Sequence, residues 1–170
     1  LSMNVAAAEI TRCVLERDDK VRILDADALN IIAGEHIDYK GSREGQIIIT
    51  PHIMEMSRLT GKTVADIKEH MIESAKEYAI QHSCICILKD ARTVVTDGQK
   101  VYINCTGNDG MSTGGCGDVL TGLIAGMTAM GLDAFEAACL SVYVHGKAGD
   151  YAASGKGRTG MTAADVSEAI

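Results

Sequence analysis

The residues best suited to chemistry form one glycine-rich stretch, Asn108-Asp-Gly-Met-Ser-Thr-Gly-Gly-Cys-Gly-Asp118. A helical pattern follows it, so Gly114, Gly115 and Gly117 would place bare backbone N–H groups at a helix N-terminus. Free donors and the helix dipole favour an anion there. Asp118, in the first helical turn, could accept a proton from a substrate hydroxyl beside a bound phosphate. The stretch therefore predicts a phosphate site with a base attached.

The same residues also have a purely structural interpretation. Gly-Gly-x-Gly can make a tight turn, and Asp118 can cap the helix that follows. The spacing matches neither the Walker A motif nor the dinucleotide-binding fingerprint. The loop alone therefore indicates an anion site without identifying its ligand.

Hydrophobic periodicity and turn residues predict the elements that position this loop. Helices are expected over residues 3–16, 28–33 and 63–82 and, after the loop, near 117–130, 133–153 and 162–170. Strands are expected at 21–24, 46–50 and 84–88, followed by a hairpin of 93–96 and 101–103. Asp97-Gly98 would supply the positive φ angles of a tight hairpin turn.

The order of these elements is that of an α/β protein. Apolar strands alternating with helices imply a largely parallel sheet covered on both faces, and ligands then bind beyond the carboxyl ends of the strands. Four segments follow strands and can converge on one crevice, namely residues 25–30, 51–55, 89–93 and the glycine loop.

The composition bounds the class of protein. With 170 residues, 46% of them hydrophobic, the chain can form one domain, or part of one, with a buried core. A net charge of −7 without a cluster of Lys and Arg argues against nucleic-acid binding. The six cysteines lack zinc-ligand spacing and are expected to be buried, reduced thiols. No stretch resembles a membrane span or a signal peptide, which favours a cytoplasmic protein that does not bind membranes.

Four motifs carry a resemblance to a known family. They are Asp-Ala-Asp-Ala-Leu-Asn (25–30), Thr-Pro-His-x-x-Glu-Met (50–56), Leu-Lys-x-Ala-Arg-Thr (88–93) and Asn-x-Gly-Met-x-Thr-Gly-Gly-x-Gly-Asp-Val-Leu-Thr-Gly (108–122). In this order they resemble the ADP/ATP-dependent NAD(P)H-hydrate dehydratases of the ribokinase-like superfamily, and the likeness runs over residues 4–170. It implies a ribokinase-like three-layer sandwich with a mostly parallel sheet.

The resemblance also implies a reaction that repairs hydrated nicotinamide nucleotides. ADP or ATP, with Mg²⁺, would phosphorylate the hydroxyl of the S-form of NADHX or NADPHX, and loss of phosphate would restore NADH or NADPH. By the family's pattern Asp118 is the base that faces the hydrate hydroxyl. Gly115 and Gly117, with Gly114, form the anion hole for the transferring phosphoryl group, and His52 binds the hydrate.

Two segments are expected to line the nucleotide in the same resemblance. The first is Lys89, Asp90, Ala91, Arg92 and Thr93, and the second is Asn108, Asp109, Gly110, Met111, Ser112, Thr113, Gly114, Gly115, Cys116 and Gly117. Lys89 can meet a phosphate as a point charge, although a lone Lys at a strand end is usually only solvated. The hairpin over 93–103 could shelter the adenine.

Oxygen ligands for Mg²⁺ are offered by Asp25, Asp27 and Asn30, acting through water, although Asp27 could equally cap the helix at 28–33. His145-Gly146 is expected to pack beneath the loop.

Two residues and the length depart from the family's pattern. Met54 and Asp90 stand where the family usually has Gly, and an inward-pointing Asp90 would weaken ADP or ATP binding. The family ordinarily has a substantial N-terminal part before the first helix. Residues 1–170 are therefore expected to be the C-terminal portion of a single dehydratase domain, which alone binds nucleotide weakly, lacks activity and self-associates as a homo-oligomer.

Two other functions remain open. One is a small-molecule kinase of the same superfamily, acting on a vitamin precursor or a sugar, since the loop and Asp118 would serve it equally well. The other is an inactive nucleotide-binding module. The motifs at 25–30 and 50–56 favour the dehydratase.

Overall fold

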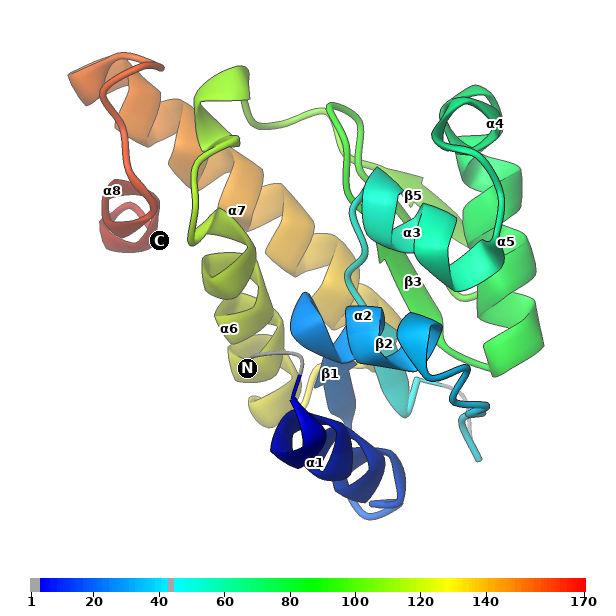
Figure 1. Ribbon diagram of the computed structural model, residues 1–170. Coiled ribbons are helices and arrows are strands. Elements are labelled where there is room, and N and C mark those ends of the chain that lie inside the picture. Colours follow the sequence, from blue (N-terminus) through cyan, green and yellow to red (C-terminus); the bar gives the residue numbers. More distant parts are fainter. Residues whose placement is uncertain (1–3, 43–44) are drawn as a thin grey trace.

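The computed structural model describes residues 4–42 and 45–170 and is built around a five-stranded sheet (Figure 1). The strands are β1 (Arg22–Leu24), β2 (Ile47–Ile49), β3 (Ile85–Leu88), β4 (Val94–Thr96) and β5 (Val101–Ile103), and they lie in this order across the sheet. β1, β2 and β3 are parallel, whereas β4 and β5 form an antiparallel hairpin against β3. The expected α/β class with a mostly parallel sheet is confirmed.

Helices cover both faces of the sheet and make three layers (Figure 1). They are α1 (Val5–Leu15), α2 (Asp27–Gly34), α3 (Ile53–Thr60), α4 (Val64–Glu69), α5 (Met71–His82), α6 (Cys116–Ala129), α7 (Ala134–Lys156) and α8 (Ala163–Glu168), with a 3-10 helix, η1 (Asp109–Met111), in the glycine loop. Successive strand residues face opposite sides of a sheet. Ile47 and Ile49 therefore pack with α2, α3 and α5, whereas Ile48 packs with α6 and α7.

No helix was expected directly after the strand at 46–50, but helix α3 begins at Ile53, within the segment 51–55. The His52 ring accepts hydrogen bonds at Nδ1 from the backbone N–H groups of Met54 and Glu55, at 3.1 and 3.2 Å. In return the backbone N–H of His52 donates to the Glu55 carboxylate at 2.9 Å. This capping box uses a histidine, whereas Ser, Thr, Asp or Asn mark most helix starts, so the sequence signal is weak.

Two further expectations need correction. The helix expected over 63–82 is divided at His70, whose φ of −126° and ψ of 48° are not helical, so α4 and α5 are separate. The hairpin turn spans residues 97–100, between the expected strands, but only one of its two named residues has the expected positive φ. Of the pair expected there, Gly98 has a positive φ of 97°, whereas Asp97 instead accepts backbone hydrogen bonds within the turn.

A smaller core, separate from those on the two faces of the sheet, lies beneath the glycine loop. Its buried residues come from the start of α6, from α7 and from the C-terminal segment, and they are Cys116, Ala148, Ala152, Met161 and Val166. The start of α6 is therefore anchored by its own first residue, because Cys116 is buried against residues of α7 and α8, and Met111 of the same loop packs on this cluster as well.

The cysteines are free thiols, but only some are buried. Cys84, Cys86 and Cys116 are buried as expected, whereas Cys13 and Cys105 are exposed, so the expectation is wrong for these two. Burial raises the pKa of Cys84 to about 12, which keeps this thiol protonated and unreactive at neutral pH. Within the described ranges, none of the helices is both long and apolar enough to span a bilayer.

Candidate phosphate-binding site

Three chain segments meet at an ion pair between Asp25 and Lys89. Asp25 follows β1 and Lys89 follows β3, and Lys89 Nζ lies 2.9 Å from Asp25 Oδ1. The other carboxylate oxygen, Oδ2, accepts a 3.0 Å hydrogen bond from the hydroxyl of Thr121 on α6. The strand ends and the first turns of α6 are thus joined directly, at the edge of the sheet where parallel strands place their ligands.

Asp25 is held in its ionised form. Burial opposes ionisation, but the charge and the hydrogen bond of Lys89, together with the Thr121 hydroxyl, outweigh it, and the pKa of Asp25 lies below its ordinary value. The chain turns sharply after this residue, because Ala26 has φ 49° and ψ −115° and the N–H of Ala28 donates to the Asp25 carbonyl at 3.1 Å. This is a type II′ turn, which favours glycine at the place of Ala26, so backbone strain is held beside the ion pair.

The glycine loop presents the N-terminus of α6 next to this pair. Gly115 occupies the N-cap with a φ of 94°, in the left-handed region, and no side chain caps the helix. The first N–H groups of a helix have no acceptor within it, which suits them to bind an anion. A methyl group on Gly117 would lie 3.5 Å from Asp25 Oδ2 and 3.7 Å from Lys89 Nζ. The Lys89 cation therefore lies close to the helix start, and both favour a negative ligand.

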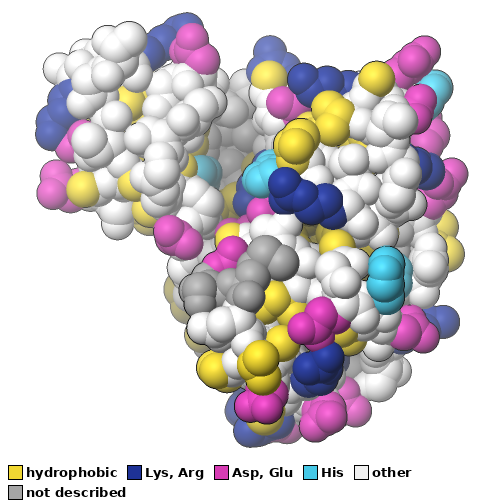
Figure 2. Space-filling model, in the orientation of Figure 1, with side chains coloured by type: hydrophobic (Ala, Val, Ile, Leu, Met, Phe, Trp, Pro, Cys, Tyr) yellow, Lys and Arg dark blue, Asp and Glu magenta, His cyan; other side chains and the backbone are white. Residues whose placement is uncertain are grey.

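Asp118, the residue expected to act as the base, lies in the first turn of α6 with its side chain exposed. Gly114 is exposed as well, and it precedes the N-cap residue Gly115. The surface of the molecule is hollowed between the part formed by α6, α7 and α8 and the part that carries α3 (Figure 2). A ligand that contacts the helix start can therefore meet both the backbone donors and the carboxylate.

His52, the expected hydrate ligand, is a neighbour of Lys89. The two residues form an isolated β-bridge just beyond β2 and β3, and the Lys89 N–H donates to the Pro51 carbonyl at 2.7 Å. Because Nδ1 accepts the capping bonds of α3, the neutral ring carries its proton on Nε2, which lies 3.2 Å from Glu55 Oε1. The His52 side chain is 48% exposed, so it caps the helix and still reaches solvent beside Lys89.

The rest of the segment 89–93 lies at the surface. Asp90, Ala91 and Arg92 are exposed, and Thr93 is half-buried with its hydroxyl donating to the Asp90 carbonyl at 3.3 Å. Met54, the other departure from the family's pattern, is also exposed. Neither departure takes part in the contacts between Asp25 and Lys89.

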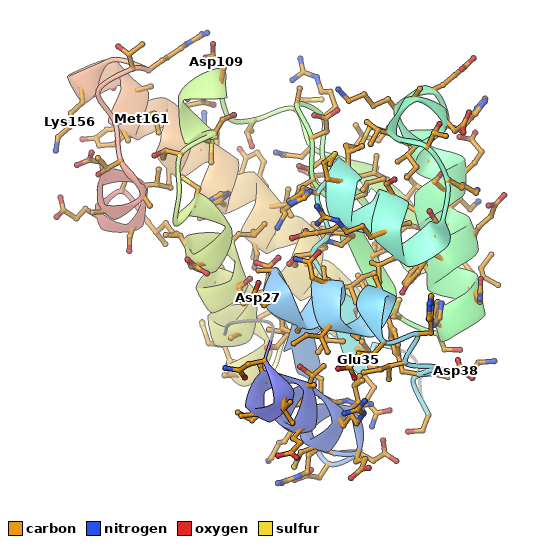
Figure 3. The ribbon with its side chains drawn as sticks, viewed as in Figure 1. Asp27, Glu35, Asp38, Asp109, Lys156 and Met161 are labelled. Atoms are coloured by element: carbon orange, nitrogen blue, oxygen red, sulfur yellow. The ribbon has the colours of Figure 1, made fainter. Side chains whose placement is uncertain are left out.

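The residues before the glycines form the short helix η1. Asn108 begins it, and its side-chain oxygen accepts from the Gly110 N–H at 3.0 Å. A methyl group on Gly110 would lie 2.3 Å from the Arg158 carbonyl, so η1 fits tightly against the connection between α7 and α8. The Asp109 side chain is 79% exposed at the outer end of η1 and pairs with Arg158 at 3.2 Å (Figure 3). Met111 and Thr113 are half-buried, and Ser112 is exposed.

His145 of α7 lies beneath the loop, as expected, and is buried. Burial and the nearby Lys89 charge lower the pKa of His145, whereas a hydrogen bond with the Cys116 backbone raises it. The net effect is a lowered pKa, so the ring is neutral at pH 7. Its Nε2 atom is buried without a hydrogen-bond partner among the described residues. The sequence assigned no role to Thr121, although its position three residues after Asp118 places both on one side of α6.

The oxygen ligands considered for Mg²⁺ do not assemble into a metal site. Asp25 is already in an ion pair, and the Asn30 side-chain oxygen accepts from Arg58 at 2.7 Å. Asp27 begins α2 on the side toward α6 (Figure 3), and the N-cap position belongs to Ala26, so the capping alternative is wrong. Over residues 4–42 and 45–170, no three His, Cys, Asp or Glu side chains lie together as metal ligands. These residues therefore do not fit a direct magnesium site.

The fold and the site together define a ribokinase-like protein. The sheet is flanked by helices on both faces, and a glycine-rich helix start lies beyond its parallel strands. The structure of a ribokinase-like superfamily protein from Enterococcus faecalis matches this chain with a TM-score of 0.86 and 26% identity, over 99% of this chain and 58% of that one. The family model for NAD(P)H-hydrate dehydratases matches residues 1–170, and the chain belongs to this family.

Known proteins similar to this chain are named for the same chemistry. The bifunctional NAD(P)H-hydrate repair enzyme Nnr of Moorella thermoacetica is 45% identical over 168 residues, which are 98% of this chain and 31% of that protein. The ADP-dependent (S)-NAD(P)H-hydrate dehydratase of Neisseria meningitidis is 33% identical over 96% of this chain and 56% of its own length. The crystal structure of the ADP/ATP-dependent NAD(P)H-hydrate dehydratase of Bacillus subtilis, co-crystallized with ATP/Mg²⁺, matches with a TM-score of 0.87 and 31% identity, over 99% of this chain and 59% of that one. The chain thus spans between about a third and three fifths of these relatives.

Proposed function

We propose that the whole protein carrying this chain catalyses the ADP- or ATP-dependent dehydration of the S-forms of NADHX and NADPHX to NADH and NADPH. One observation supports this above others: the Lys89 cation, the N–H groups at the start of α6 and the exposed Asp118 lie together beyond the parallel strands. These groups can hold a transferring phosphoryl group beside a hydroxyl and remove the proton of that hydroxyl. Membership of the family supports the choice of substrate.

In the proposed reaction Asp118 accepts the proton of the hydrate hydroxyl while the hydroxyl oxygen attacks the terminal phosphorus of the nucleotide. The bond from that phosphorus to the leaving nucleotide breaks, and the N–H groups of Gly115 and Gly117, with Lys89, stabilise the negative charge that develops. Phosphate then leaves with the C–O bonding electrons. A proton is lost from the neighbouring carbon, and the ring double bond is restored.

The remaining assignments follow from the same proposal. The nucleotide lies along residues 89–93 and 108–117, and His52 contacts the hydrate. Mg²⁺ would accompany the nucleotide and offset its phosphate charge, held by phosphate oxygens and water, since no three His, Cys, Asp or Glu side chains of the described residues cluster as metal ligands. We further propose that the chain is the C-terminal portion of one cytoplasmic dehydratase domain and that the protein forms homo-oligomers.

The test is an assay of the whole protein with (S)-NADHX and either ADP or ATP, following the recovery of the near-ultraviolet absorbance of NADH. We expect turnover that requires the nucleotide, and we expect residues 1–170 alone to be inactive. A phosphorylated product that accumulates without release of NADH would favour a small-molecule kinase. Nucleotide binding without any turnover would favour an inactive binding module.

A further inference from the structure

One side of α7 is shaped to receive the segment 106–111. Gly146 and Gly149 lie three residues apart and therefore on the same side of the helix. A methyl group on Gly146 would lie 2.1 Å from Thr106 Oγ1, and one on Gly149 would lie 2.2 Å from Met111 Sδ. At Gly146 the methyl group would also lie 2.8 Å from the backbone carbon of Thr106, whereas at Gly149 the Met111 side chain fills the space, so the segment packs closely against this side of α7.

Asp150, the next residue of α7, holds this segment with both oxygens of its carboxylate. Oδ2 accepts the backbone N–H of Gly107 at 3.0 Å, and Oδ1 accepts Asn108 Nδ2 at 3.1 Å. The same Asn108 nitrogen donates to the Gly149 carbonyl at 3.0 Å. Hydrogen bonds to an ionised acceptor are stronger than bonds between neutral groups. The two hydrogen bonds accepted by the Asp150 carboxylate are therefore the strongest polar contacts between α7 and this segment.

Asn108 connects the contact with Asp150 to the start of η1. Its nitrogen is bound to α7, and its oxygen accepts the Gly110 N–H at the start of η1. Both the nitrogen and the oxygen of the Asn108 amide are therefore engaged in hydrogen bonds within the protein. The side chain of Asn108 therefore fixes the shape of the loop, and the nucleotide would be contacted by the loop backbone and by the residues that follow Asn108.

We propose that Asp150 is a positioning residue of the nucleotide site: from α7, through Gly107 and Asn108, it fixes the segment 106–111 in the shape that receives the nucleotide, without touching the nucleotide itself. This inference rests on the proposed function only in placing the nucleotide along residues 108–117. A loop that is already ordered loses less conformational freedom when a ligand binds. Asp150 is therefore expected to affect nucleotide affinity while leaving hydrate affinity unchanged.

The first experiment measures ADP and ATP binding to the whole protein by calorimetry in the absence of hydrate, for the wild type and for Asp150→Ala. We expect the dissociation constant for nucleotide to rise about tenfold or more, given the strength of bonds to a charged group. In turnover, the KM for nucleotide should rise by a similar factor, with the KM for (S)-NADHX and the kcat at saturating nucleotide nearly unchanged. Equal nucleotide affinity in the two proteins would overturn the proposal.

Asp133→Ala is the matched control, because Asp133 caps the N-terminus of α7, far from Asp150. It also accepts backbone hydrogen bonds, from Phe135 and Glu136 at 3.0 and 3.3 Å. The variant removes a helix cap without touching the segment 106–111. Its nucleotide affinity should equal that of the wild type. An equal loss of affinity in both variants would show that general destabilisation is responsible, and would also overturn the proposal.

A pair of exchanges keeps the test valid if Asp150→Ala does not fold. Asn108→Asp sets two carboxylates against each other, and Asp150→Asn sets two amides together, so each alone should weaken nucleotide binding. In the double variant one amide and one carboxylate again face each other, but the carboxylate at position 108 cannot donate to the Gly149 carbonyl, so part of the affinity should return. Failure of the double variant to recover any affinity would contradict the proposal.

The outcomes also distinguish the two proposals. If the variants behave as expected but no protein turns over the hydrate, the proposed function fails and the positioning role of Asp150 stands. If the wild type binds neither ADP nor ATP, both proposals fail.

Discussion

Lys89 and Asp25 form an ion pair that joins the end of β3 to the end of β1, with β2 between them in the sheet. Their side chains are only 22% and 14% exposed. Because Asp25 also accepts the Thr121 hydroxyl, the pair links the sheet to α6. A lysine has three N–H donors, and Asp25 takes one of them, so the same ammonium group can both hold the fold together here and meet a phosphate.

Replacing Lys89 by methionine should therefore have two effects in the whole protein. The free energy of unfolding should fall by about 1–3 kcal/mol, because the largely buried Asp25 carboxylate loses its counter-ion. Nucleotide affinity should fall about tenfold or more, because a cation is lost from the anion site. Urea unfolding and calorimetry with ADP measure the two effects separately.

Lys62→Met is the control for this prediction, since Lys62 pairs with Glu77 at 2.6 Å but on the surface, where ion pairs contribute at most about 1 kcal/mol. The double variant Asp25→Asn with Lys89→Met should recover much of the stability but none of the nucleotide affinity. If Lys89→Met bound ADP as tightly as the wild type, Lys89 would not be a phosphate ligand.

The lowered pKa of Asp25 predicts how stability depends on pH. Its pKa is lower in the folded protein than in the unfolded chain, where it takes its ordinary value of 3.8. The stabilisation is therefore present above pH 3.8 and is lost as the pH falls through the folded-state pKa. The difference in unfolding free energy between the wild type and Asp25→Asn should be constant near neutral pH and should shrink on acidification. A difference that stayed constant down to the acid-unfolding limit would contradict the assignment.

The arrangement of the strands and the convergence of the motifs could be predicted from the sequence. Apolar runs marked the three parallel strands, and carboxyl ends of parallel strands always lie on the same edge of a sheet. That rule alone brings Asp25, His52 and Lys89 to one edge, and the glycines before the apolar pattern of α6 bring Asp118 there as well. These inferences depend only on local patterns and on chain topology.

Which side chains bond to one another could not be predicted. The contacts of Asp25 with Thr121 and of Asp150 with Asn108 join residues far apart in the chain, and no local pattern encodes them. The division of the helix at His70 was missed because the apolar spacing continues across it. The sequence did contain one indication of close packing near Asp150, because Gly146 and Gly149 leave one side of α7 without side chains just before it. Glycines in a helix indicate that another segment packs closely there, but they do not identify that segment.

Asp118→Asn tests the base directly. Loss of a general base typically lowers kcat by about 10²–10⁴-fold, and we expect an effect of this size on dehydration of (S)-NADHX. Because the Asp118 side chain is exposed, the melting temperature and the affinity for ADP should change little. Asp66→Asn, a similar change in the first turn of α4, is the control and should retain full activity. Activity close to that of the wild type in Asp118→Asn would remove Asp118 as the base.

Three glycines of the loop should respond differently to alanine, because each has a different role. A methyl group on Gly114 meets nothing within 4 Å, so Gly114→Ala should leave stability unchanged. Gly115 has a φ of 94° and would bring the methyl group to 3.0 Å from Ala163 Cβ, so Gly115→Ala should lower the unfolding free energy by about 1–2 kcal/mol.

Gly117→Ala should separate stability from binding. Gly117 is inside α6, where alanine is the better helix former by about 0.5–1 kcal/mol, and the added methyl group would make only ordinary contacts with Asp25 and Lys89. The unfolding free energy should therefore stay the same or rise. The methyl group would, however, occupy the space between the helix start and the Lys89 ammonium, where the phosphate is expected, so ADP affinity should fall. Thermal unfolding measures the stability of Gly117→Ala, and calorimetry on the same preparation measures its affinity for ADP. If the variant were more stable than the wild type and bound ADP equally tightly, the phosphate would have to bind elsewhere.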